Sequence, residues 1–102
     1  MIRNAIIIDT GDNIATVLRD VAPGGEIVAG LGDDTMVFTA VEAIPFGHKV
    51  AIRAIAKDDE ILKYGAVIGA ATADIAKGMH VHVQNVVSLR GRGDLEPQED
   101  GR

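Results

Sequence analysis

The hydrophobic residues of this chain are mostly small or β-branched, and this feature limits its possible folds most strongly. The 102 residues include 14 alanines, 12 isoleucines and 11 valines, but only three aromatic residues, Phe38, Phe46 and Tyr64. β-Branched side chains lose rotamer freedom in helices and pack well on the pleated surface of a sheet. Twelve glycines provide many positions for sharp turns. Together these features predict a mostly β, compact fold of short strands.

Apolar runs separated by Gly, Pro, Asn and Asp locate the expected strands. These strands lie at residues 4–9, 14–18, 26–29, 35–41, 50–56, 60–63, 67–69 and 80–83, and residues 86–89 trail the last of them. The first two are expected to form a hairpin. One or two short helical turns are expected over 70–76, with Gly78 as a C-terminal cap. Residues 90–102 contain little apolar surface, so we expect one domain at 1–89 and a disordered charged tail at 90–102.

Charge and cysteine content exclude several classes of function. Fifteen acidic residues against ten lysines and arginines give a net charge of -5, so no nucleic-acid partner is expected. No stretch reaches the roughly 18 apolar residues of a membrane span, and no signal-peptide pattern is present. The chain has no cysteine, which excludes disulfides, thiolate metal ligands and a cysteine nucleophile. A cytoplasmic location is therefore expected.

The three histidines, His48, His80 and His82, are the first candidates for chemistry. Residues two apart in a strand point to the same face, so His80 and His82 would present two imidazoles side by side. Such a pair suits a metal ion or an anionic substrate, although a metal needs a third ligand such as His48, Asp or Glu. Two half-exposed histidines on a polar strand face explain the same spacing without any function.

Lys49, Lys63 and Tyr64 form the second candidate set, because each lies close to a glycine at which the chain bends. Lysine binds carboxylate, phosphate or sulfonate groups as a point charge. A buried lysine can also act as a base once its pKa falls. The alternative is a pair of solvated surface lysines beside a half-buried tyrosine.

Three motifs connect these residues in one pattern. They are PFGHKVA at 45–51, ILKYGAVIG at 61–69 and IAKGMHVHVQN at 75–85. In order and spacing they resemble the SAF domain of the altronate/galactarate dehydratase family, over roughly residues 5–89. That family also includes the small subunit of (2R)-sulfolactate sulfo-lyase.

The resemblance implies a SAF or β-clip-like fold and a role as a lyase subunit. Members of the family remove water, or bisulfite in the sulfo-lyase, from small hydroxy acids. Because the chain ends at residue 102, it is expected to be a separate small subunit, inactive without a large catalytic subunit. The divalent metal, expected to be Fe²⁺, and most catalytic groups would then lie on that large subunit. In isolation, an uncovered apolar patch could drive formation of a homo-oligomer.

The resemblance also implies roles for individual residues in a site shared by the two subunits. Lys49 and Lys63 are expected to contact the substrate anion, and Tyr64 and Asn85 are further substrate-binding candidates. The catalytic candidates are the histidines, with His80 and His82 in proton transfer or metal contact, and His48 beside them.

This chain departs from the family at one position. The family pattern reads His-Val-His-x-His-Asn, whereas this chain has Gln84 at the third histidine position. Glutamine cannot carry a proton or ligate a metal comparably, which weighs against a three-histidine metal site or indicates a different substrate.

Three functional readings follow for such a domain. The first is a hydro-lyase small subunit of the altronate/galactarate type, with a sulfolactate sulfo-lyase small subunit as its variant. The second is a non-catalytic module that binds a carbohydrate or an acid. The third is a structural subunit that only stabilises its partner. The sequence leaves the substrate open, because altronate, galactarate and sulfolactate all carry a carboxylate beside a hydroxyl.

Overall fold

The computed structural model describes residues 2–88, which form strands, turns and bends without a helix. This confirms the expected mostly β fold. The predicted tail at 90–102 lies outside the described residues. The strands are β1 (Ala5–Ile6), β2 (Ile14–Val17), β3 (Glu26–Leu31), β4 (Asp34–Thr39), β5 (Lys49–Ala51), β6 (Glu60–Lys63), β7 (Ala66–Ala71), β8 (His80–Val81) and β9 (Val86–Ser88).

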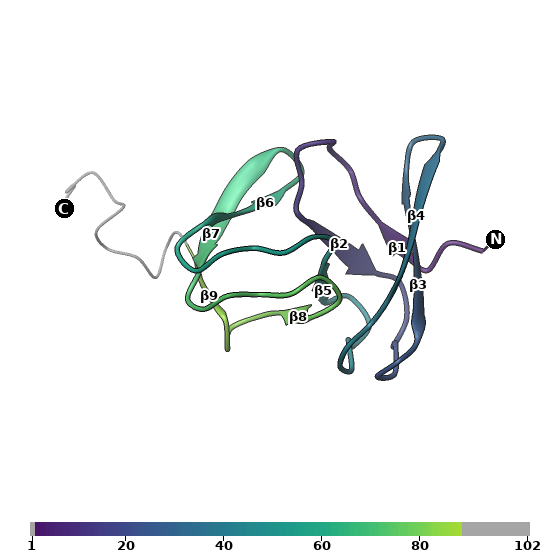
Figure 1. Cartoon of the computed structure of the whole chain (residues 1–102). Coiled ribbons are helices and arrows are strands. Elements are labelled where there is room, and N and C mark those ends of the chain that lie inside the picture. Colours follow the sequence, from purple (N-terminus) through teal and green to yellow (C-terminus); the bar gives the residue numbers. More distant parts are fainter. Residues whose placement is uncertain (1, 89–102) are drawn as a thin grey trace.

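The strands form two sheets. Six of them make a sheet in the order β4-β3-β1-β2-β5-β8, and the other three make a sheet in the order β6-β7-β9. The expected hairpin of β1 and β2 is present, with Ala5 opposite Val17. Only β1 and β3 pair in parallel among the paired strands described. In Figure 1 the β3–β4 and β6–β7 hairpins lie at opposite ends, with β2, β5 and β8 between them.

Small and β-branched side chains fill two hydrophobic clusters, as the composition predicts. The larger cluster joins β1 to β5 and includes Val17, Ile27 and Val50, all fully buried. The smaller cluster includes Ile61 and Val81, and so connects β8 to the three-stranded sheet. Strand β3 is buried at four consecutive positions, and therefore on both faces, so its small and β-branched side chains fill the space on either side of the strand.

One kind of tight turn occurs four times among residues 2–88, directly before β3, β5, β6 and β8. In each copy a buried Val or Ile, at 21, 44, 55 or 75, precedes a tight turn closed by a backbone hydrogen bond of 2.8–3.1 Å. The third turn residue has positive φ in every copy, at Gly24, Gly47, Asp58 and Gly78. The apolar residues pair across copies, Val21 with Ile44 and Ile55 with Ile75. The repeated pattern of about seven residues was not recognised from the sequence.

Two local expectations were wrong. Residues 70–76 do not form helical turns, because Ala70 and Ala71 end strand β7 and Ile75 makes a bridge to Ile55. Gly78 is therefore the left-handed residue of a turn and caps no helix. The alanine-rich segment has high helix propensity, but its backbone groups are satisfied by pairing with neighbouring strands, which overrides propensity.

No helix among residues 2–88 is long and apolar enough to cross a membrane.

Candidate functional site at a histidine cluster

Strand pairing brings the three histidines together on one side of the β5–β8 pair. Lys49 of β5 lies opposite Val81 of β8, so the adjacent residues His48 and His82 lie next to each other. His80 stands two residues before His82 and opposite Val50. The imidazole centroids are 4.3 Å apart for His48 and His82, 5.0 Å for His48 and His80, and 5.3 Å for His80 and His82. The expected pair is thus a group of three, hereafter the histidine cluster.

A turn of defined geometry positions His48. The His48 N–H donates to the Pro45 carbonyl at 2.9 Å, and Gly47 between them has a φ of 81°. Glycine at this turn position avoids the steric cost of a left-handed backbone. The Phe46 N–H donates to the Asp20 carboxylate at 2.7 Å, which fixes the turn from the other side. The PFGH segment therefore places one imidazole beside β8.

Asn85 orients the other two histidines. Its side chain is 6% exposed and uses both halves of its amide. Nδ2 donates to the His80 carbonyl at 2.8 Å, and Oδ1 accepts the His82 N–H at 3.0 Å. The geometry gives Asn85 a positioning role, and its predicted contact with substrate stays a prediction.

Hydrogen bonds link the cluster to its surroundings. His48 Nδ1 and His80 Nε2 are 2.9 Å apart, so one of these nitrogens donates to the other. The Gln84 amide Nε2 lies 3.4 Å from His80 Nδ1 and 3.3 Å from the His80 carbonyl. Glu42, which the sequence did not single out, accepts the His80 N–H at 3.0 Å. Its carboxylate is a partner supplied by tertiary structure, 38 positions away in the sequence.

The surroundings favour the neutral form of His80 and His82. Burial, followed by the charges of His48 and His82, lowers the pKa of His80, while Glu42 acts in the opposite direction. Burial and the charges of His48 and Lys49 also lower the pKa of His82. His80 and His82 are therefore suited to act as hydrogen-bond acceptors or as metal ligands.

Lys49 directly follows His48, and its charge acts on both His80 and His82. Burial lowers its pKa, and the charge of Lys63 lowers it further. The two lysines, predicted together as anion contacts, therefore sense each other although they belong to different sheets. A negative ligand near both ammonium groups would offset their repulsion, which favours the binding of an anion.

A groove of about 380 Å³ lies beside the cluster, within the size range of sites for small molecules. Lys49 and His82 contribute its basic and imidazole groups, and Ile68 contributes from β7. Ile68 is the extra residue at an irregularity of the β6–β7 pairing, which bends that strand at this point. The lining residues are Lys49, Ile68, His82, Val83, Val86, Val87 and Ser88.

Tyr64 lies at the tip of the β6–β7 hairpin and does not line this groove. Its side chain is 57% exposed, and the Lys63 ammonium lies 4.9 Å from its ring centroid. Tyr64 and Gly65 both have positive φ, 56° and 76°, as a two-residue hairpin turn requires. The structure therefore groups Tyr64 with Lys63, and neither residue is among those that line the groove.

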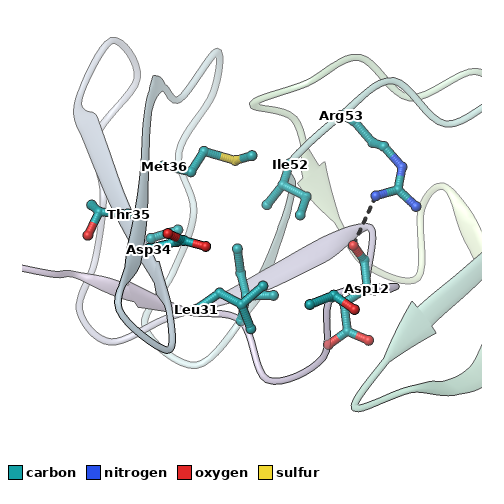
Figure 2. A pocket seen from close by; sticks show the side chains of 10 residues that line it. Asp12, Leu31, Asp34, Thr35, Met36, Ile52 and Arg53 are labelled. Carbon is teal, nitrogen blue, oxygen red and sulfur yellow. Dashed lines mark hydrogen bonds between the residues drawn. The ribbon is translucent and has the colours of Figure 1, made fainter.

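A second hollow, of about 300 Å³, is lined by none of the predicted site residues. It lies beside the β3–β4 hairpin, and Figure 2 shows Leu31, Met36 and Ile52 facing it. Arg53 at its edge donates from Nη1 to the Asp12 carbonyl at 3.0 Å. The Asp12 carboxylate is already occupied by backbone N–H groups. The lining of this second hollow is mainly apolar, so the histidine cluster is the stronger candidate for chemistry.

Comparison with known proteins identifies the family of the chain. The family model of the altronate/galactarate dehydratase SAF domain matches residues 3–89. The chain belongs to this family. The histidine cluster lies within the matched range, with His48 directly before β5, His80 at the start of β8 and His82 directly after β8.

Individual relatives of this SAF domain differ in length. The chain is 36% identical to (2R)-sulfolactate sulfo-lyase subunit alpha of Chromohalobacter salexigens, over 83% of this chain and 94% of that protein. It is 43% identical to altronate dehydratase of Escherichia coli over 72% of this chain, but only 14% of that enzyme. It is 37% identical to altronate dehydratase of Bacillus subtilis over 81% of this chain and 16% of that enzyme. The same domain thus matches almost a whole subunit in one relative and about a seventh of a longer enzyme in others.

Proposed function

We propose that this SAF domain is the small subunit of a carbon–oxygen lyase that dehydrates a small hydroxy acid. The observation that carries the proposal is the grouping of Lys49 and the histidine cluster beside one groove. In this proposal Lys49 and Lys63 bind the substrate carboxylate, and the histidine cluster faces the hydroxyl that leaves. The names of the relatives, a sulfo-lyase subunit and dehydratases, support the same class of reaction.

The chemistry of elimination explains why such a group of side chains beside a groove is useful. Removing water requires a base for the proton next to the carboxylate, an acid or Lewis acid for the departing hydroxyl, and a clamp for the carboxylate. The lysines can provide the clamp. A protonated imidazole can give its proton to the departing hydroxyl, whereas a neutral imidazole can hold a metal ion.

A larger partner would complete the site. Elimination also requires a base, and the Glu42 carboxylate beside the cluster already accepts the His80 backbone N–H. Phe46 and Val83, next to the histidines in sequence, are 65% and 81% exposed. Large apolar side chains that border a polar site are typical of a surface covered by another protein. In this proposal the partner covers them and carries the Fe²⁺ and the remaining catalytic groups.

A second candidate is the small subunit of a sulfolactate sulfo-lyase. The relative of that name aligns over 94% of its length, which favours a chain of this size as a separate subunit. Sulfolactate has a sulfonate in addition to its carboxylate, and two lysines can bind two anionic groups. The substrate therefore decides whether water or bisulfite leaves.

Reconstitution tests the proposal. The full chain is purified alone and together with the large chain with which it associates, and each preparation is assayed with altronate, galactarate and sulfolactate. We expect turnover of one acid by the complex and none by the chain alone. Turnover by the isolated chain would contradict a shared site.

Variants at the cluster separate catalysis from binding. His80→Ala should lower kcat of the complex, because the imidazole acts on the reacting hydroxyl. A non-catalytic binding module would instead lose affinity for the acid while kcat stays the same. A purely structural subunit would lose neither, provided that the complex still assembles.

A further inference from the structure

We propose that His48, His80 and His82 form a binding site for one divalent transition metal ion of the zinc type on this chain itself. The inference goes beyond the proposed function and does not depend on which acid is the substrate. Each histidine offers one ring nitrogen, and these three atoms lie within 4.8 Å of one another.

The distances suit a shared ion after small side-chain movements. Zinc–nitrogen bonds of about 2.0–2.1 Å in a tetrahedral site place the ligand nitrogens roughly 3.3 Å apart. His48 Nδ1 and His80 Nε2 are already 2.9 Å apart and face each other. The ring centroids of His48 and His82 are 4.3 Å apart. Rotation of half-buried imidazoles is enough to close the remaining difference.

The backbone that carries the ligands is fixed before any ion binds. β5 and β8 are hydrogen-bonded, and Asn85 holds the His80 carbonyl and the His82 N–H. The Pro45–His48 turn fixes the third ligand. Ligands on a rigid support lose little entropy on binding, which raises the affinity of a site.

The kind of ligand identifies the class of ion. Three imidazoles suit Zn²⁺, Co²⁺, Ni²⁺ or Fe²⁺, whereas Mg²⁺ and Ca²⁺ prefer oxygen ligands. Three protein ligands leave the fourth position open for water or substrate, which is typical of catalytic rather than structural zinc. The groove beside His82 gives a small acid access to such an open position.

Gln84 does not prevent this site, although it occupies the position of a family histidine. Its amide lies at Nδ1 of His80, on the opposite side of the ring from Nε2. His48 supplies the third imidazole from a different strand, so three nitrogen ligands are present without residue 84. The HVHVQN segment by itself holds only two histidines, and the sequence does not locate His48 relative to it.

Direct titration tests the site. The full chain, prepared without a histidine tag and freed of metal by a chelator, is titrated with Zn²⁺ by calorimetry and with Co²⁺ by visible absorption. We expect one ion per chain and a cobalt spectrum of a low-coordinate nitrogen site. Because the chain has three histidines in total, binding by other imidazoles cannot obscure the result.

Single variants identify the ligands. His48→Ala, His80→Ala and His82→Ala should each weaken Zn²⁺ binding by about 100-fold or more, since changes even in outer-shell partners cost about 10–100-fold. Lys57→Gln, a charge change at an exposed residue outside the cluster, is the matched control and should bind as the unmodified chain does. Circular dichroism verifies that each variant is folded, and His→Gln replaces His→Ala where it is not.

Two results would overturn the inference: no saturable binding of Zn²⁺ or Co²⁺, or binding that survives all three histidine substitutions. The outcome is separable from that of reconstitution. If the chain binds zinc but supports no turnover with its partner, the proposed lyase function is contradicted and the metal site is not. An active complex whose small chain binds no metal contradicts this site alone.

Discussion

The Asp12 carboxylate accepts the backbone N–H of Tyr64 at 2.9 Å, although 52 positions separate the two residues in the chain. The other carboxylate oxygen accepts the Gly65 N–H, also at 2.9 Å. Asp12 thereby supports both left-handed residues of the β6–β7 turn, on which Lys63 and Tyr64 depend for their position. The side chain is 2% exposed, so no water can replace it easily.

Removal of this carboxylate should destabilise the fold. Asp12→Ala leaves the N–H groups of Tyr64 and Gly65 without their acceptor, and the expected loss is about 2–4 kcal/mol of unfolding free energy. Urea denaturation measures it. Asp9→Ala, which removes one exposed hydrogen bond to Gly11, is the control and should cost less than about 1 kcal/mol. Equal losses in the two variants would contradict the role of Asp12.

The same carboxylate should make stability fall in acid. Burial alone would raise the pKa of Asp12, but hydrogen bonds from Gly65, Tyr64, Asp9 and Ile8 outweigh it and lower the pKa below 3.8. The folded pKa lies below the unfolded one, so the contribution is complete above about pH 4 and is lost as pH falls through the folded value.

The unfolding free energy measured against pH tests this sign. We expect the stability difference between the unmodified chain and Asp12→Asn to be constant near neutral pH and to shrink below about pH 4. A difference that grows in acid would show that the folded pKa of Asp12 is raised.

Two glycines of the repeated turn form a matched pair. Gly47 and Gly78 have φ values of 81° and 90°, so alanine at either position carries the cost of a left-handed backbone, about 1–2 kcal/mol. A Cβ at Gly47 meets open space, whereas one at Gly78 collides with the Thr39 carbonyl. Gly78→Ala should therefore be more destabilising than Gly47→Ala by about 1–3 kcal/mol. Thermal and urea unfolding of the two variants give the comparison, and equal stabilities would contradict it.

The two lysines should affect substrate binding in the reconstituted enzyme. Lys49→Met and Lys63→Met each remove a positive charge while keeping an apolar stem, so KM should rise about 10-fold, the equivalent of roughly 1.4 kcal/mol. Lys57→Met is the matched control and should leave KM unchanged. Steady-state kinetics with the acid identified in the reconstitution provide the measurement, and unchanged KM in both lysine variants would remove them from the site.

Much of the fold follows from local sequence. The β-branched composition and the turn residues predict most strands, and eight of the nine strands observed among residues 2–88 overlap an expected one, whereas β9 follows the segment expected to be the last strand. The resemblance carried by the three motifs correctly predicts the family. The error at 70–76 has a physical reason, because alanine favours helices in isolation, whereas pairing between strands decides the conformation here.

The sequence by itself determined the class of fold, the family and the identity of the chemical groups, because periodicity and motif order are properties of residues close together in the chain. Tertiary structure alone decided which groups meet. His48 joins His80 through pairing of β5 with β8, Glu42 reaches His80 across 38 positions, and Asp12 reaches Tyr64 across 52. Such contacts depend on how the strands pair in space, which no spacing within a single segment specifies.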